Sequence, residues 1–522
     1  MCIRFLVPVL LLPLMLGACS EAPDSAPTPG AETTSQAPPQ TASAREIAWF
    51  EGSLDEAFTA AKAGDKPLFV YWGAQWCPYC KYLQATIFVR DEFISISRQF
   101  IAVDMSNGDS ETIRQSDRFN IAGLPTVILF APDGTELTRI PGGMDMEQYA
   151  SVLELTLNTL RPVAEVLAAA RTGATLADDD WRLLANYSWR SDRARMLEEE
   201  DPAALLAQLA ADCPVRLDLA CSRLRLAATR FWLSAEEESR DSAIGAENLK
   251  AFVEILGNPA LRPANMITLA DLGSDVVTEL ASGEQQAGLR ADLMNYLQAA
   301  AGNENLGLLQ QTTILSGWAG VATALLEEDQ SPPAKLVDWG RNTADGMMQA
   351  LTPYQVHAGI NQLWFVYYQL GLEQDARKAL AKGIDESQSP FYFMSGMAYL
   401  EREAGNNQAA LEWSRKAWEA AGEPMDRARW GSGYIRRLLD LAPEQSEEVQ
   451  RAVSLWLSEL AAQPYGIEVY ANSLERLNTR LGEWSEEDPA RGEVVAGLRS
   501  ELAGHCAQCQ PESPVAACES VM

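Results

Sequence analysis

Two cysteines three positions apart, Cys77 and Cys80, are the residues of this chain best suited to chemistry. They follow an apolar run, Pro67 to Trp72, that predicts a buried strand, and they precede a segment, Lys81 to Ala85, that predicts a helix. Cys77 is therefore expected at a helix N-terminus, where free backbone N–H groups and the helix dipole stabilise a thiolate. Because thiolates attack disulfides, and a second cysteine one turn away can resolve the mixed disulfide, the spacing predicts a two-electron thiol–disulfide switch.

A zinc half-site or a static disulfide would be the simpler explanations of a cysteine pair. The sequence continues, however, with further predicted strands at Phe100–Asp104, Val127–Phe130 and Glu136–Ile140, and then with a helical pattern up to Leu160 that Asp145 could cap. No second pair of metal ligands lies in this stretch, which argues against zinc. The cysteine pair between a strand and a helix favours a redox role.

The stretch from about Ile47 to Leu160 resembles the thioredoxin superfamily, and most closely the periplasmic thioredoxin-like domain of thiol:disulfide interchange reductases. The matching segments are Lys66-Pro67, Trp76-Cys77-x-x-Cys80-Lys81, Thr86-Ile87-Phe88 and Gly123-Leu124-Pro125-Thr126. The resemblance implies an α/β thioredoxin-like domain over residues 46–160, with Cys77 and Cys80 as its catalytic pair.

The same resemblance implies how a client would be held. It implies a cis Pro125 that faces the cysteine pair and a backbone at Leu124 that pairs with the client chain. Trp76, Pro78 and Tyr79 surround the cysteines and are expected to contact the substrate as well. Neither a cofactor nor a metal is expected.

Two positions depart from the pattern. Many relatives carry a buried acid six residues before the first cysteine, as a proton relay, and here that residue is Tyr71. Asp104 is a possible substitute. Pro78 removes one N–H donor near the sulfur, which suggests a redox poise less reducing than that of thioredoxin proper.

The N-terminus resembles a bacterial lipoprotein signal. Residues 1–18 contain Arg4 and a short apolar run that ends in Leu16-Gly17-Ala18 before Cys19, so that cleavage there would leave a lipidated cysteine. An ordinary signal peptide is the alternative. Ser20 in place of an aspartate favours the outer membrane. Residues 19–45 are rich in Pro, Ser, Thr and Ala and predict a disordered tether.

Composition limits the remaining possibilities. A chain of 522 residues is expected to hold more than one domain, and its hydrophobic content of 47% suffices for globular cores. The net charge of −31 and the lack of a Lys/Arg cluster along the chain argue against a nucleic-acid surface.

Beyond the first domain, residues 161–502 are rich in Ala, Leu and Glu with a helical period, which predicts an all-α region. Leu370–Ala376 and Ala404–Ala410 lie 34 residues apart and share the position of a glycine. This spacing resembles tetratricopeptide repeats, which would offer partners an extended surface. A generic helical bundle with a coincidental match is the alternative.

The other cysteines suit an oxidising compartment. Cys213 and Cys221 are eight residues apart with helical sequence between them, and we expect a structural disulfide. The tail, residues 503–522, holds His505, Cys506, Cys509 and Cys518, in which a disulfide is favoured over a zinc set or a redox relay with Cys77. His357 stands alone and is expected to be structural.

These observations leave three classes of function. The first is a lipid-anchored thiol–disulfide oxidoreductase of the cell envelope that acts on protein clients and depends on an upstream redox partner. The second is a helical scaffold in which the thioredoxin-like fold is mainly an interaction module. The third is an oxidase or isomerase of the same fold, which differs from a reductase in poise and partners.

Overall fold

The computed structural model describes residues 46–141, 146–159, 161–192, 196–197, 200–327, 330–486 and 488–507. These residues fall within one compact unit. The predicted signal, Cys19 and the tether lie outside the described residues, as do Asp145, Cys509 and Cys518.

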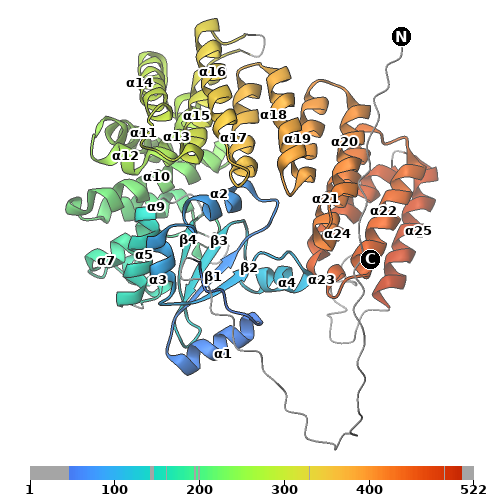
Figure 1. Ribbon diagram of the computed structural model, residues 1–522, viewed down its shortest axis with the longest axis horizontal. Coiled ribbons are helices and arrows are strands. Elements are labelled where there is room, and N and C mark those ends of the chain that lie inside the picture. The colour runs from blue at the N-terminus through green and yellow to red at the C-terminus, as the bar shows by residue number, and fades with distance from the viewer. Residues whose placement is uncertain are drawn as a thin grey trace, which may run out of the picture. The chain divides into compact units, whose positions relative to one another are not determined.

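A four-stranded sheet forms the centre of the first domain, in the order β2-β1-β3-β4 (Figure 1). The strands are β1 (Leu68–Trp72), β2 (Ile101–Met105), β3 (Thr126–Phe130) and β4 (Glu136–Pro141). β1 runs parallel to β2 and antiparallel to β3, and β3 runs antiparallel to β4. Every residue of β1 and of β3 is buried, which explains their uninterrupted apolar sequences.

Helices cover both faces of this sheet. They are α1 (Leu54–Gly64), α2 (Pro78–Thr86), α3 (Asp91–Ser97), α4 (Ser110–Arg118) and α5 (Met146–Thr159). Alternate residues of β1 enter different cores: Phe69 and Tyr71 pack with residues of α2, α3 and α5, whereas Val70 and Trp72 pack with residues of α1. Because the two faces of the sheet pack against different helices, α2 and the cysteine pair lie on one face only.

The rest of the chain is helical throughout its described part, and successive helices pack on one another (Figure 1). Its first helices are α6 (Val163–Arg171), α7 (Asp178–Ala185), α9 (Pro202–Asp212), α10 (Asp218–Ser234), α11 (Ser242–Gly257), α12 (Leu261–Ala264), α13 (Met266–Asp275), α14 (Gly283–Ala301), α15 (Leu308–Thr323) and α16 (Ala334–Ala350). They are followed by α17 (Val356–Gln369), α18 (Glu373–Glu386), α19 (Pro390–Glu403), α20 (Asn407–Ala420), α21 (Pro424–Leu441), α22 (Ser446–Ala461), α23 (Gly466–Val469), α24 (Ala471–Glu486) and α25 (Pro489–Cys506). The predicted fold class, a thioredoxin-like α/β domain followed by an all-helical region, is confirmed in this form.

The 34-residue spacing seen in the sequence corresponds to two helix pairs, α17–α18 and α19–α20. The first helix of each pair ends at a glycine with positive φ, +73° at Gly371 and +75° at Gly405. A residue in the left-handed conformation lets the chain reverse while the last carbonyl groups of the helix stay hydrogen-bonded. A residue with a side chain would be strained in this conformation, which favours glycine. Gly383 lies against the ring of Phe393, so α18 approaches α19 closely only because it carries no side chain there.

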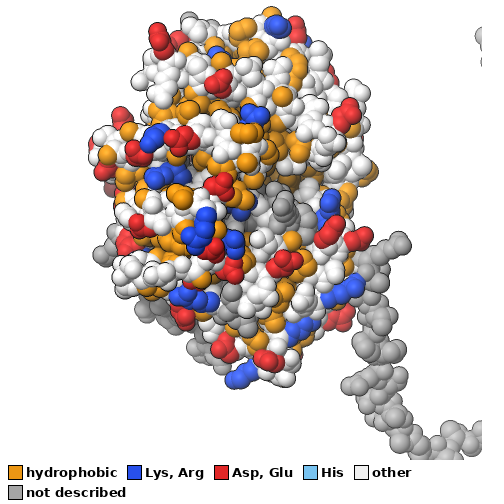
Figure 2. All heavy atoms as spheres, turned by 90° about the vertical axis from the view of Figure 1, so that its left-hand side faces the viewer, with side chains coloured by type: hydrophobic (Ala, Val, Ile, Leu, Met, Phe, Trp, Pro, Cys, Tyr) orange, Lys and Arg blue, Asp and Glu red, His pale blue; other side chains and the backbone are white. Residues whose placement is uncertain are grey.

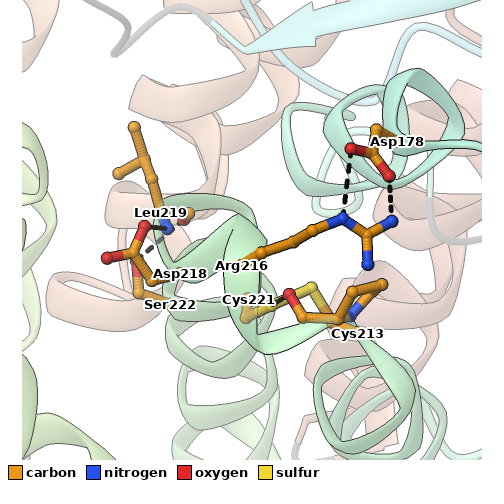
Figure 3. Close-up of a disulfide and its surroundings, with 8 residues drawn as sticks. Asp178, Cys213, Arg216, Asp218, Leu219, Cys221 and Ser222 are labelled. Atoms are coloured by element: carbon orange, nitrogen blue, oxygen red, sulfur yellow. Dashed lines mark hydrogen bonds and ion pairs between the residues drawn. A yellow bond between two sulfur atoms is a disulfide. The ribbon is translucent and has the colours of Figure 1, made fainter.

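Cys213 and Cys221 are joined by a disulfide with an S–S distance of 2.05 Å (Figure 3). The bond connects the end of α9 to the first turns of α10 across a short 3-10 turn, Val215–Leu217. In the same turn Arg216 forms an ion pair with Asp178 of α7, so the three helices meet at one point (Figure 3).

A buried arginine joins the sheet to the helical region. The Arg139 side chain of β4 is 1% exposed, and its Nη1 lies 3.2 Å from Asp192 Oδ1, which is fully buried. The same guanidinium contacts Glu136 and donates to the carbonyl oxygen of Phe119 at 2.7 Å. A buried charge is tolerated only when its hydrogen bonds are satisfied, so Asp192 and Arg139 depend on each other.

We therefore expect Arg139→Ala to lower the free energy of unfolding by about 3–5 kcal/mol, because it breaks a buried ion pair and removes the hydrogen bond to the Phe119 carbonyl oxygen. Urea unfolding followed by circular dichroism would measure this. Arg118→Ala is the matched control, since Arg118 and its partner Asp55 are 50% and 66% exposed and such pairs contribute less than about 1 kcal/mol. Equal losses in the two variants would contradict the prediction.

Candidate functional site

Cys77 caps the N-terminus of α2. Strand β1 ends at Trp72, and after a short turn Cys77 takes up an extended conformation as the N-cap residue, with Pro78 in the first turn. The backbone N–H of Cys80 donates to Cys77 Sγ at 3.3 Å. The sulfur thus occupies the place where a serine or aspartate oxygen normally satisfies a free amide.

The loop before β3 brings a second backbone segment to the same sulfur. The Leu124–Pro125 peptide bond is cis. Cys77 Sγ lies 3.6 Å from the carbonyl oxygen of Leu124. Leu124 and Pro125 are half-buried, and Gly123 before them is exposed. The structure therefore brings Cys77, Cys80, Leu124 and Pro125 together, the arrangement that the resemblance implied.

The two thiols lie in different electrostatic environments. The Cys80 side chain hydrogen-bonds the Cys77 sulfur and lowers the pKa of Cys77, against burial, and the amides of Cys80 and Tyr79 and the charge of Arg429 lower it further. Burial raises the pKa of the Cys80 thiol well above its ordinary value. Cys77 is 4% exposed and Cys80 is fully buried. The pKa of Cys77 is thus lowered and that of Cys80 raised, so Cys77 is the more readily ionised thiol of the pair.

Tyr71 occupies the position where many relatives carry an acid, and its hydroxyl hydrogen-bonds the Cys80 thiol. Burial raises the pKa of Tyr71 far above its ordinary value, so the hydroxyl stays protonated and can donate to sulfur. Gln84 Nε2 in turn donates to the Tyr71 oxygen at 3.4 Å. Asp104, the substitute considered from the sequence, stands opposite Tyr71 on β2; its side chain reaches solvent, but partial burial raises the pKa of its carboxyl.

A histidine of the helical region contacts Trp76, the residue just before the cysteine pair. His357 of α17 bonds the carbonyl oxygen of Trp76 through Nε2 at 2.9 Å, and its Nδ1 lies 2.7 Å from Ser387 Oγ. Because a carbonyl only accepts, Nε2 carries the proton and Nδ1 accepts from the serine hydroxyl. His357, expected only to be structural, therefore supports the cysteine loop from a distance of 281 residues along the chain.

Residues of α21 pack on the Trp76 indole. Its ring meets the ring of Trp430 edge to face at 5.3 Å between centroids, and the guanidinium of Arg429 lies 4.3 Å above it. The Asp426 carboxylate hydrogen-bonds the Trp76 side chain. Tyr79, on the other side of the pair, is 55% exposed, and its hydroxyl hydrogen-bonds Gln362 of α17. None of these partners was predicted from the sequence, because no pattern near the cysteines indicates packing against α17 or α21.

Metal ligands do not gather elsewhere in the described residues: no group of three or more His, Cys, Asp or Glu side chains is placed to hold an ion there. Cys506, one member of the alternative zinc set, is disulfide-bonded. Among the described helices, none is both long and apolar enough to cross a membrane.

Comparisons with known proteins agree with this geometry. A family model described as thioredoxin-like domain matches residues 54–156. The thiol:disulfide interchange protein DsbD of Yersinia pestis is 31% identical over 103 residues, which cover 18% of this chain and 17% of that protein. DsbD of Actinobacillus pleuropneumoniae is 30% identical over 104 residues, 19% of this chain and 18% of that protein. The chain thus spans less than a fifth of the length of these curated relatives.

A solved structure named DsbH oxidoreductase is also similar, at 20% sequence identity. The match covers 25% of this chain and 96% of that one, with a TM-score of 0.20.

The environment of His357 makes the docking of the two regions sensitive to pH. Burial lowers the pKa of His357 from 6.5 to about 4. The folded protein therefore binds fewer protons than the unfolded chain between these values, so the stability from this site is complete above pH 6.5 and is lost as the pH falls toward 4. We expect a loss of about 2–3 kcal/mol at pH 4.5 relative to pH 7.5.

Urea unfolding at both pH values would measure this loss, with His357→Gln as the comparison, since glutamine can donate to the Trp76 carbonyl but does not titrate. The wild-type protein should lose about 2–3 kcal/mol more than the variant on acidification. An identical pH dependence of the two proteins would rule out a neutral buried His357.

Proposed function

We propose that this protein is a thiol–disulfide oxidoreductase that acts on protein clients and works in the reductive direction. One observation carries the proposal: Cys77 Sγ caps α2, accepts from the Cys80 N–H at 3.3 Å and lies 3.6 Å from the Leu124 carbonyl beside Pro125. The thioredoxin-like domain and its similarity to thiol:disulfide interchange proteins support the same class of reaction.

The reaction follows from the division between the two thiols. The Cys77 thiolate attacks one sulfur of a client disulfide, forming a Cys77–client bond and releasing a client thiolate that takes up a proton. Cys80 then loses its proton and attacks Cys77 Sγ, which forms the Cys77–Cys80 disulfide and releases the second client thiolate. Two electrons pass to the client, so a partner protein must reduce the pair for the next cycle.

Residues around the pair would hold the client during this exchange. The backbone at Leu124 and Pro125 would pair with the client chain, and Trp76, Pro78 and Tyr79 would contact its side chains. A client bound there has its disulfide next to the Cys77 sulfur, which lowers the entropic cost of the attack. By donating to the Cys80 sulfur, the Tyr71 hydroxyl would favour the thiolate that Cys80 must form to resolve the mixed disulfide.

The cellular setting is part of the proposal. The lipoprotein-like leader, residues 1–18, would place a lipidated Cys19 on a bacterial cell-envelope membrane, with the outer membrane favoured, and residues 19–45 would tether the domain at 46–160. The Cys213–Cys221 disulfide supports an oxidising compartment. The helical region at 161–502, with tetratricopeptide-like pairs at α17–α20, would dock partners, and residues 503–522 would form a cysteine-containing tail.

A trapping experiment tests the catalytic roles. In Cys80→Ala the Cys77 thiolate can attack but nothing displaces it, so mixed disulfides with clients should accumulate and be identified by mass spectrometry. Cys77→Ser is the control and should trap nothing, and its disulfide reductase activity should fall to the background rate. Reductase activity in Cys77→Ser equal to that of the wild type would contradict the proposal.

A partner-binding scaffold is the competing function, because α17 and α21 contact the cysteine loop directly. The double variant Cys77→Ser/Cys80→Ser separates the two. If that variant keeps the cellular role, the scaffold is favoured over the enzyme. A redox titration of the pair against glutathione separates a reductase from an oxidase or isomerase, since a strongly oxidising potential would reverse the direction proposed here.

A further inference from the structure

A large cavity in the last part of the helical region reaches the cysteine loop at Trp76. Its volume is about 730 Å³, and Trp76, the residue before Cys77, forms part of its wall. Most of the other lining residues come from α21 and α24. These two helices contribute five arginines: Arg429, Arg436, Arg437, Arg476 and Arg480.

This cationic wall contrasts with the rest of the chain. The protein carries 72 acidic and 41 basic residues, for a net charge of −31. On the face drawn in Figure 2, acidic and basic side chains are interspersed among apolar ones. Among the residues that line the cavity, by contrast, none is acidic. A local positive field in an acidic protein attracts anions selectively.

The arginines are only partly neutralised by the protein itself. Arg480 pairs with Asp440. Arg429 lies over the rings of Trp76 and Trp430, and its charge also interacts with the Asp426 carboxylate. Burial lowers the pKa of Arg437, and the neighbouring charges of Arg402 and Arg436 lower it further, whereas the charge of Asp440 raises it. Guanidiniums placed side by side destabilise one another unless an anion lies between them.

The spacing of the charges indicates the shape of the ligand. Arg429 and Arg436 are seven residues apart on α21, which at 1.5 Å per residue corresponds to about 10 Å along the helix. Arg476 and Arg480 are neighbours on one face of α24. Charges distributed along two helices match several anionic groups on an extended chain better than one compact anion, and the indoles of Trp76 and Trp430 supply apolar surface between them.

We propose that this cavity, the arginine pocket, binds a segment of the client rich in aspartate and glutamate, and thereby presents the client's disulfide to Cys77. The inference rests on the proposed function, since it names the class of client. Arg429 and Trp76 connect the two sites: the Arg429 guanidinium contacts the Trp76 ring at 4.3 Å, and Cys77 follows in the chain. Charge complementarity at such a site raises the rate of productive encounter and selects among clients.

The test compares two charge-matched variants of the full-length chain. Arg436→Gln/Arg476→Gln removes two charges from the pocket. Arg415→Gln/Arg451→Gln removes two exposed arginines that form ion pairs on α20 and α22, outside the pocket. Each protein is given two peptides that carry the same disulfide, one flanked by three glutamates and the other by three glutamines, and kcat/KM for reduction is measured.

For the pocket variant we expect kcat/KM on the acidic peptide to fall about tenfold, and kcat/KM on the neutral peptide to stay within about twofold. The control variant should stay within about twofold on both peptides. Wild-type preference for the acidic peptide should also weaken as the salt concentration rises. Equal effects on the two peptides, or an equal fall in the control, would overturn the assignment.

A second readout does not depend on redox activity. Fluorescence anisotropy of a cysteine-free acidic peptide is measured on Cys77→Ser/Cys80→Ser, with and without the two pocket substitutions. Binding that disappears with the pocket substitutions supports the pocket even if no peptide disulfide is ever reduced, in which case only the redox function fails. Reduction of both peptides without any such binding would overturn the proposed role of the pocket but not the redox function. Tight binding of inorganic phosphate that the acidic peptide cannot displace would have the same consequence.

Discussion

The hydrogen bond from the Cys80 N–H to Cys77 Sγ is the interaction on which the site depends. An unpaired thiolate in a buried setting would be costly, because burial disfavours the charged form. The hydrogen bond with the Cys80 side chain offsets this cost, together with the free amides at the N-terminus of α2 and the positive end of its dipole. Burial also raises the pKa of Cys80, and there it is the largest effect and is not offset. One local feature, a cysteine as the N-cap, thus makes two identical side chains chemically different.

The surrounding fold keeps this cap in place. On one side, β1 and the α2 core bury Tyr71 and Cys80 together, so the resolving thiol has a protonated hydroxyl as its neighbour. On the other side, His357 and Trp430 hold Trp76 through its carbonyl and its ring. The helical region therefore does more than lie next to the redox domain, since it provides contacts to the residue that directly precedes the nucleophile. The buried pair of Arg139 and Asp192 joins the two regions at a second point.

Local sequence was a good guide to the first domain. The predicted strands differ from β1, β2 and β4 by about one residue, and the helix start at Cys77 follows from the strand before it and Pro78 after it. Helix α1 was not predicted, because its signal is a capping box at Ser53 and Glu56 rather than an apolar stripe. The sequence also did not show which residues of β1 face which side of the sheet. A strand buried on both faces is apolar throughout, so its hydrophobicity does not alternate from one residue to the next.

Long-range contacts could not be predicted, for a physical reason. His357 meets Trp76 only because α17 packs on α2, and no pattern within either segment encodes that packing. The arginine pocket is a clearer case. Its arginines come from two stretches, around Arg436 and around Arg480, and become a cluster only when α21 packs against α24. The absence of a Lys/Arg cluster along the chain therefore did not exclude one in space.

The central claim is that residue 77 is a thiolate near neutral pH. The most direct measurement is the rate of iodoacetamide alkylation of reduced full-length protein from pH 4 to pH 10, with peptide mapping to follow residues 77 and 80 separately. The account predicts that the alkylation rate of Cys77 titrates below the ordinary thiol midpoint of about 8.5, while Cys80 remains unreactive across the neutral range. A midpoint for Cys77 at or above that of an ordinary thiol would contradict it.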